Sequence, residues 1–174
     1  MPNHCNNRLF CTDASLESVI KQFISKDDAD YPFLDFDKIV KMPEELQVTC
    51  AFNSQDADLQ ETYKANLKKY GFENWYDWCV ANWGTKWNSY DFDSNDDECS
   101  FSTAWAPPLP VIAELAKKTG NTFVLEYIEE GCAFVGRFTA SPDGCDDECY
   151  NIPDAPQELL DSLGYEPYEE EVEA

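Results

Sequence analysis

The stretch PVIAELAKKTGNTFVLEYIEEGCAFVGRFT, residues 110–139, decides the fold, because it places one helix and two strands in a row. Pro110 marks the entry to the helix, and Gly120 ends it. The run TFVLEYI at 122–128 is rich in β-branched and aromatic residues, which favour a strand. The residues EEG form a tight turn, so CAFVGRFT at 132–139 is predicted to be the partner strand of a hairpin.

Two further strands are expected before this stretch. Residues 87–92 alternate loosely between apolar and polar side chains, and residues 99–105, CSFSTAW, alternate again. The polar sequence DSNDDE at 93–98 separates the two runs. This pattern predicts a second hairpin.

The start of the chain supplies the first strand and the first helix. Residues 6–12 form a short run bounded by turn and capping residues, which predicts a strand. In ASLESVIKQFIS, residues 14–25, apolar side chains recur at intervals of three and four, as in an amphipathic helix. Asp13 or Ser15 is placed to cap this helix.

The predicted order is therefore strand, helix, insertion, strand, strand, helix, strand, strand. It is the split βαβ pattern of ferredoxin-like α+β domains, with an extra C-terminal strand and a helical insertion after the first helix. We expect a ferredoxin-like domain over residues 1–140, with the insertion at about 27–86. Residues 141–174 are expected to be an acidic C-terminal extension that is partly disordered.

The insertion is expected to contain two helices. Residues 57–70 have helical periodicity, and Gly71 is placed to end them in a left-handed conformation. Asn74 is the expected cap of the second helix. That helix begins the stretch WYDWCVANWGTKWN, residues 75–88, which holds four of the five tryptophans.

The tryptophan-rich helix raises the question of whether its rings form a core or a stacking platform for nucleobases. At about 100° per residue, one arc of the helix is apolar and predicts a core-facing stripe of Trp75, Tyr76, Cys79, Val80 and Trp83. Trp78 lies at the edge of this arc and is expected to be partly exposed. A stacking platform works beside cations that neutralise phosphates, yet Lys86 is the only basic residue between Lys69 and Lys117. Core packing is therefore the favoured interpretation.

Several segments resemble the YubB-like proteins of plasmids and phages, a family of unknown function with a ferredoxin-like domain. The matching segments are MPNHCNNRL at the start, KMPEEL at 41–46, YDWCVANWGTKWN at 76–88, FSTAWAPPLPVI at 101–112 and FVLEYIEEGCAFVG at 123–136. The resemblance implies the same fold and an origin on a mobile genetic element. It implies no catalytic residues, because none are established for the family.

The eight cysteines and the single histidine bear on cellular location and on catalysis. Most of the cysteines lie in apolar stretches, so we expect buried, reduced thiols in the cytoplasm rather than disulfides. The chain begins without a basic region followed by an apolar run, and no stretch approaches about 18 uncharged apolar residues. These features predict a cytoplasmic protein without a membrane span. A zinc site needs two cysteine pairs or a histidine partner, yet Cys145 and Cys149 stand alone and the only histidine is His4, so no metal or other cofactor is expected.

Negative charge is the most unusual property of the chain. It has 35 acidic and 12 basic residues, which give a formal net charge of -23 at pH 7. After Phe138 the sequence contains twelve acidic residues and no basic one, and five more acids lie within DFDSNDDE at 91–98. Such segments repel DNA and RNA but attract the proteins that bind them.

We therefore expect a non-enzymatic protein-binding factor of a mobile genetic element. In its sharper form the hypothesis is an acidic nucleic-acid mimic, which inhibits a host nucleic-acid-binding defence enzyme of the CRISPR or restriction type. In an extended segment, carboxylates at alternate positions such as Asp91 and Asp93 would lie about 6.6 Å apart on one face and engage the same rows of Lys and Arg as phosphates do. The expected partner-binding residues are Asp91, Asp93, Asp96, Asp97, Glu98, Asp143, Asp146, Asp147 and Glu148.

Two other function classes stay open. One is a small metal-dependent or thiol enzyme centred on His4 and Cys5, although adjacent residues of a strand point to opposite faces and cannot pair as nucleophile and base. The other is an accessory protein that assembles with itself. The common structural alternative to mimicry is that the acidic runs are solvated loops and a solubilising tail.

Overall fold

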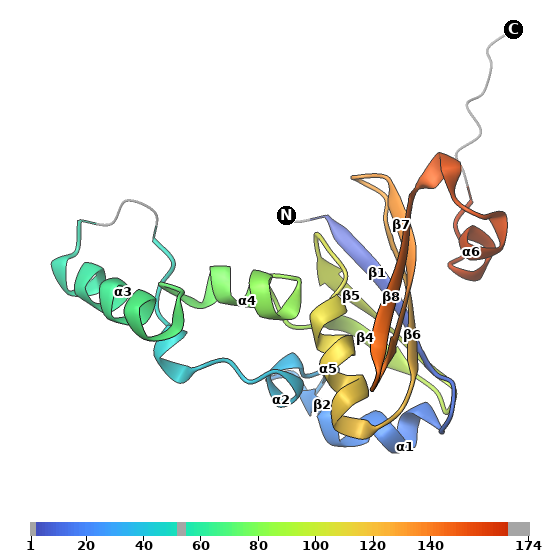
Figure 1. Ribbon diagram of the computed structural model, residues 1–174, viewed down its shortest axis with the longest axis horizontal. Coiled ribbons are helices and arrows are strands. Elements are labelled where there is room, and N and C mark those ends of the chain that lie inside the picture. The colour runs from blue at the N-terminus through green and yellow to red at the C-terminus, as the bar shows by residue number, and fades with distance from the viewer. Residues whose placement is uncertain (1–2, 52–54, 167–174) are drawn as a thin grey trace, which may run out of the picture.

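A computed structural model describes residues 3–51 and 55–166 (Figure 1). Six strands form one sheet in the order β4-β5-β1-β6-β7-β8, and every neighbouring pair is antiparallel. The strands of this sheet are β1 (His4–Cys11), β4 (Tyr90–Ser94), β5 (Glu98–Ala104), β6 (Phe123–Glu129), β7 (Phe134–Ser141) and β8 (Gly144–Asn151). The long helix on the sheet is α5 (Leu109–Thr119).

Four strands of this sheet, β1, β4, β5 and β6, and two helices make the ferredoxin-like unit. β1 leads through α1 (Leu16–Ile20) to β4, and β5 lies between β1 and β4. β5 then leads through α5 to β6, which pairs with the other side of β1. This arrangement is the split βαβ topology predicted from the order of elements.

Two strands, β7 and β8, widen the sheet beyond this unit, which corrects the expectation of a single added strand. β8 lies inside the segment 141–174, which was expected to be an acidic extension, and it pairs with β7 from Ser141↔Gly144 to Phe134↔Asn151. The segment continues into a 3-10 turn, η3 (Ile152–Asp154), and the helix α6 (Gln157–Ser162). Disorder was expected for part of this segment, and residues 167–174 lie outside the described residues.

The main core fills the face of the sheet that α1 and α5 cover. β1, β5 and β6 each direct alternate side chains into it, and Leu9, Phe101 and Leu125 are almost fully buried. α5 presents Val111, Ile112, Leu115 and Ala116 to this face, all of them fully buried. Each large apolar side chain buried in this way contributes roughly 1.5–3 kcal/mol.

The opposite face has a smaller cluster under α6. Ile128 of β6 and Val135 of β7 are opposite one another in the register and are buried beneath Leu159 and Leu160. Figure 1 shows α6 on the side of the sheet away from α5. α6 therefore leaves much of this second face to polar side chains.

The segment between α1 and β4 contains short elements and two longer helices. A 3-10 turn, η1 (Lys21–Phe23), follows α1 directly, and the chain then forms a small hairpin of β2 (Ile24–Lys26) and β3 (Pro32–Leu34). The predicted helix over 14–25 is thus shorter in the structure, beginning at the Ser15 cap and ending at Ile20. The remaining elements are α2 (Phe36–Ile39), the 3-10 turn η2 (Glu44–Leu46), α3 (Ala57–Tyr70) and α4 (Trp75–Trp83).

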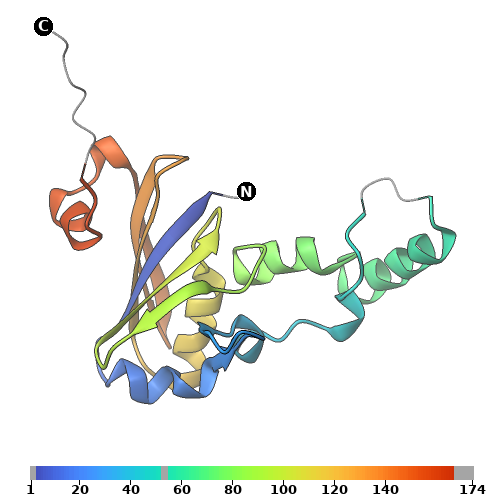
Figure 2. The same cartoon turned by 180° about the vertical axis from the view of Figure 1, so that it is seen from behind.

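The two longer helices have the predicted ends. Asp56 and Asn74 accept backbone N–H groups at the starts of α3 and α4, and Gly71 and Gly84 follow their ends with φ of 79° and 81°. Positive φ favours glycine at this position. Figure 2, seen from behind, shows α3 and α4 extending away from the sheet on the side opposite α6.

The buried face of α4 differs from the predicted stripe. Trp78 is only 7% exposed, whereas Val80 is 45% exposed. The helix is turned so that the indole of Trp78 packs edge-on against Trp83, with ring centroids 5.7 Å apart. Burying a second tryptophan in place of a valine removes more apolar area from water, which accounts for the rotation.

Candidate protein-binding surface at the sheet edges

The structure places the two acidic segments at opposite edges of the sheet. Residues 91–98 lie on β4, the following turn and the start of β5, whereas residues 143–148 lie before and on β8. β4 and β8 are the first and last strands of the sheet. Five inter-strand spacings of about 4.8 Å separate them by about 24 Å. The nine predicted residues therefore form two groups rather than one surface.

A β-bulge breaks the predicted alternation of Asp91 and Asp93. In the register, Tyr90 is opposite Ser102 and Asp93 is opposite Ser100, so the shift lies between Tyr90 and Asp93. Asp91 has a positive φ of 51°, in the left-handed region. The expectation that Asp91 and Asp93 follow one straight row at about 6.6 Å is therefore wrong, because the bulge turns Asp91 out of the row.

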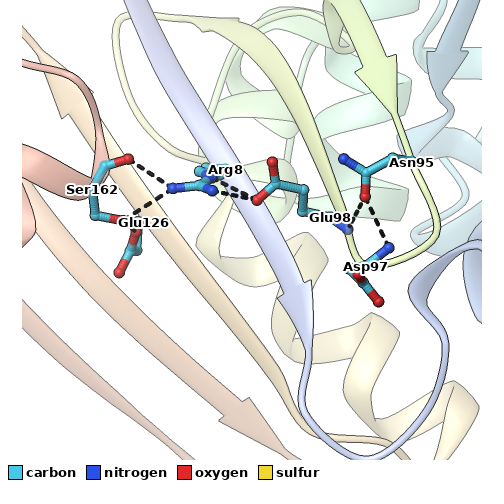
Figure 3. A network of polar contacts seen from close by, with 6 residues as sticks. All are labelled: Arg8, Asn95, Asp97, Glu98, Glu126 and Ser162. Atoms are coloured by element: carbon cyan, nitrogen blue, oxygen red, sulfur yellow. Dashed lines mark hydrogen bonds and ion pairs between the residues drawn. The ribbon is translucent and has the colours of Figure 1, made fainter.

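The turn between β4 and β5 is held by hydrogen bonds that Figure 3 shows. The side-chain oxygen of Asn95 accepts the backbone N–H groups of Asp97 and Glu98, at 2.9 and 3.1 Å. The backbone oxygen of Asp96 accepts the N–H of Glu17 at the start of α1. The carboxylates of Asp96 and Asp97 are consequently exposed on an ordered turn.

Glu98 is engaged inside the molecule. Its Oε2 accepts a hydrogen bond of 2.8 Å from Nε of Arg8, and the same guanidinium donates from Nη1 to Ser162 at the end of α6 (Figure 3). The side chains of Arg8 and Glu98 are each about one-third exposed. Glu98 therefore has an intramolecular cation and is a weaker candidate for contact with a partner than Asp96 or Asp97.

On β8 the acidic side chains divide between the two faces of the sheet. Asp147 points to the same face as Tyr127, whose hydroxyl donates to Asp147 Oδ1 at 2.8 Å. Burial, followed by this hydrogen bond, raises the pKa of Tyr127 well above its ordinary value. Asp146 and Glu148 point to the other face, and Asp143 lies in the turn before the strand. All four residues are exposed.

The register also aligns a row of mostly charged residues across the face of the sheet on which α6 lies. From edge to edge the row is Asp93, Ser100, Arg8, Glu126, Arg137 and Glu148. Acidic and basic residues alternate along it from Arg8 to Glu148, which favours the register. Within the row, Arg137 donates to Glu126 from Nε and Nη2, at 3.0 and 2.7 Å. The centre of the face is thereby neutralised, whereas Asp93 and Glu148 at its ends make no ion pair within the described residues.

The alternative site at His4 and Cys5 lacks the geometry of a nucleophile and base. His4 is exposed and lies 3.0 Å from the Tyr90 hydroxyl, whereas Cys5 is fully buried on the other face of β1. Burial raises the pKa of the Cys5 thiol to about 12. Among residues 3–51 and 55–166, no group of three or more His, Cys, Asp and Glu side chains is placed to hold a metal ion.

The cysteines are free throughout the described residues, and they divide by position. Cys5, Cys79 and Cys99 are buried, and burial raises the pKa of each thiol to about 12. Cys132, expected in a buried strand, lies in the exposed turn before β7, and the cysteines on β8 are exposed as well. An edge strand explains the exposure on β8, because β7 pairs with one of its edges and, within the described residues, no strand pairs with the other.

The tryptophan-rich stretch forms both core and surface. Lys86 stacks its ammonium over Trp87, 4.0 Å from the ring centroid, and lies 5.8 Å from Trp105. Both indoles are nearly half exposed. Beside them is an open hollow of about 430 Å³, lined in part by Trp75 and Trp83. The helical periodicity of α4 identified the buried rings, but the meeting of Trp105 with Lys86 depends on tertiary structure and has no signal in the sequence.

Comparison with a protein-family model supports the fold. Residues 82–167 match the family model described as the ferredoxin-like domain in Api92-like protein, so the matched part runs past residue 140 through β8 and α6. A crystal structure of a protein api92 from Yersinia pseudotuberculosis is similar, with 12% sequence identity, coverage of 90% of this chain and 100% of that chain, and a TM-score of 0.48. No curated protein matches the chain.

The match confirms a ferredoxin-like α+β domain, whereas the YubB-like name and an origin on a plasmid or phage stay predictions. Within the described residues, no helix has the length and apolar character needed to cross a membrane.

Proposed function

We propose that this chain is a non-enzymatic protein-binding factor that presents the carboxylates of its β8 edge to a basic, nucleic-acid-binding surface of another protein. The observation that carries the proposal is the state of β8. It is the last strand of the sheet, its residues from Gly144 to Cys149 are exposed, and within the described residues no strand pairs with its outer side. It combines an unpaired sheet edge with a dense run of acids.

The β8 edge can present carboxylates in fixed positions. Asp146 and Glu148 are two residues apart on one face of an extended strand, so their Cα atoms are separated by about 6.8 Å. The pairing of β8 with β7 along its whole length holds this spacing, and the bond from Tyr127 fixes Asp147 on the other face. A backbone held in this way loses little conformational entropy on binding, which favours affinity.

Charge-assisted hydrogen bonds are the proposed means of recognition. Carboxylates at the edge would replace nucleic-acid phosphates as partners of Lys and Arg side chains. The net charge of -23 would accelerate encounter with a basic partner, and salt would weaken that attraction. The second acidic group, with Asp93, Asp96 and Asp97 exposed, lies about 24 Å away and would contact only a partner that spans the sheet.

The resemblance to plasmid and phage proteins gives the proposal its sharper form. In that form the partner is a host defence enzyme of the CRISPR or restriction type, and occupancy of its nucleic-acid channel inhibits it. The protein would act in the cytoplasm and would not contact nucleic acid itself. Glu98 and Asp147 take part through the positions that they stabilise, since both have partners within the molecule.

Charge reversal on β8 tests the proposal. The variant Asp146→Lys with Glu148→Lys is expected to lose capture of the basic partner from host lysate by at least about tenfold, because each fixed carboxylate becomes a repelling cation. The control is Glu61→Lys with Glu73→Lys, two exposed residues of the insertion, which changes the net charge by the same amount. Equal capture by wild type and the β8 variant would show that the acids of this edge only aid solubility.

A further inference from the structure

A second site lies at the other edge of the sheet, where the β2–β3 hairpin contacts β4. A cavity of about 480 Å³ opens there, with walls from the hairpin and from residues 88–92. Its volume falls within the range of ligand pockets in proteins, which is about 300–1,000 Å³. β3 and β4 come from separate sheets, and the packing between them forms the cavity.

Two carboxylates line this cavity, and both retain acceptor capacity. Asp27 uses Oδ1 to accept the backbone N–H groups of Ala29 and Tyr31, both at 2.9 Å, and within the described residues its Oδ2 has no partner. Asp91 makes no side-chain hydrogen bond or ion pair within these residues. The neighbouring cation, Lys26, pairs instead with Asp30 at 2.9 Å. The cavity therefore has two acidic groups and no basic residue in its lining.

The backbone at Asp91 explains how this side chain joins the cavity. A regular strand would continue the alternation past Tyr90, but the register shift and the φ of 51° turn the chain at this position. Bulges of this kind re-aim one side chain beside binding sites. Asparagine and aspartate tolerate the left-handed region better than most residues, so the turn is compatible with an acidic side chain.

Aromatic rings supply the remaining wall. Tyr31, which is 70% exposed, Phe33 of β3 and both Tyr90 and Phe92 of β4 line the cavity. The hydroxyl of Tyr90 is within hydrogen-bonding distance of His4 Nδ1 and of the backbone oxygen of Thr103, at 3.0 and 3.2 Å, which fixes this ring. Ring faces attract cations, and a planar guanidinium stacks on them more favourably than a hydrated ammonium does.

We propose that this cavity binds a guanidinium group, with Asp27 and Asp91 as its anionic partners and the tyrosine and phenylalanine rings around its planar face. The inference extends the proposed function, because an arginine side chain of the basic partner is one source of such a group and a free guanidinium compound is the other. Both sources share the chemistry that the cavity fits, namely one delocalised cation with an apolar stem.

The test uses the full-length protein and N-acetyl-arginine amide, which has no carboxylate. In an NMR titration, we expect saturable shifts of the backbone amides of Tyr31, Phe33 and residues 88–92, with a dissociation constant on the order of 1 mM. N-acetyl-citrulline amide, the neutral analogue of the same shape, should bind at least about tenfold more weakly. Equal binding of the two compounds, or shifts elsewhere in the molecule, would overturn the proposal.

Conservative variants test whether the two carboxylates that line the cavity bind the arginine compound. Asp91→Asn and Asp27→Asn keep the backbone conformation and the Oδ1 acceptor, so each should fold and yet bind the arginine compound at least about fivefold more weakly. The control is Asp28→Asn, which removes the same charge from the exposed residue next to Asp27, outside the cavity lining, and should bind like wild type.

Partner capture by the same variants identifies the source of the cation. Reduced capture by Asp91→Asn assigns the guanidinium to the partner, whereas unchanged capture with weakened binding of the arginine compound assigns it to a free ligand; both outcomes support the site. Equal capture by wild type and the β8 variant, with arginine binding intact, would reject the proposed function alone. Equal arginine binding by wild type and both variants would reject the cavity alone.

Discussion

Gly136→Ala should destabilise the protein by about 3 kcal/mol, at the upper end of the usual cost of overpacking a core. A Cβ at this position would lie 2.3 Å from both Cζ and Oη of Tyr127 and 2.8 Å from the backbone oxygen of Glu148. Tyr127 is only 2% exposed and its hydroxyl is bonded to Asp147, so the ring cannot move aside freely. The substitution must therefore push β8 away from β7.

Urea unfolding and amide hydrogen exchange measure this effect. The free energy of unfolding should fall. Relative to wild type, the exchange of β8 amides should accelerate more than that of β1 amides. Gly144→Ala is the matched control, because nothing lies within 4 Å of its Cβ position and the stability should stay within about 0.5 kcal/mol. Wild-type stability of Gly136→Ala would mean that Tyr127 does not lie across this glycine and that β8 is held in some other way.

Arg137→Ala should cost about 2–3 kcal/mol, because it leaves the carboxylate of Glu126 buried without its cation. The side chain of Glu126 is 6% exposed, and within the described residues its one partner besides Arg137 is the hydroxyl of Ser162, at 2.5 Å. The side chain of Arg137 is 37% exposed, so the cost is set below the 3–5 kcal/mol of a fully buried pair. The hydrogen bond to Glu126 also raises the pKa of Arg137, so this guanidinium remains charged.

Chemical denaturation of three variants isolates this interaction. Arg137→Leu combined with Glu126→Leu should recover much of the loss, since no buried charge is then left unpaired. Lys41→Ala breaks an exposed pair with Asp37 and should change the stability by less than about 1 kcal/mol. A double variant less stable than Arg137→Ala alone would contradict the assignment of the loss to an unpaired carboxylate.

The sequence was informative wherever burial imposes a regular pattern. α5 and the β6–β7 hairpin were found within a few residues of their observed ends, because their apolar side chains recur with the periods of a helix and of a strand. Glycines after α3, α4 and α5 marked the helix ends, since each has a positive φ that other residues avoid. The order of these elements was sufficient to predict the ferredoxin-like topology.

β8 was not predicted as a strand, because its sequence GCDDECYN has no apolar alternation. The side chains on both faces of β8 are exposed to water over most of its length, so burial imposes no pattern there. The small β2–β3 hairpin was missed for a related reason, since three-residue strands are too short to show a period. These elements depend on pairing with a neighbour rather than on their own composition.

The candidate site was predicted as a list of acids but not as an arrangement. Sequence spacing cannot show that Arg8 neutralises Glu98, because the two residues meet through the pairing of β1 with β5. Nor could alternation anticipate the bulge that turns Asp91 toward the hairpin, since a bulge inserts a residue that the period does not count. The proposed guanidinium site appears only once the fold brings Asp27 and Asp91 to one cavity.

Competition by a single-stranded oligonucleotide, added to the complex between this chain and its captured partner, tests the central claim most directly. If the carboxylates of Asp146 and Glu148 occupy positions that phosphates otherwise take, the oligonucleotide should release the partner at concentrations that leave the folded protein intact. An uncharged oligomer of the same length should not release it. A complex that stays intact in saturating oligonucleotide would contradict the claim, because the partner would then bind this chain outside its nucleic-acid surface.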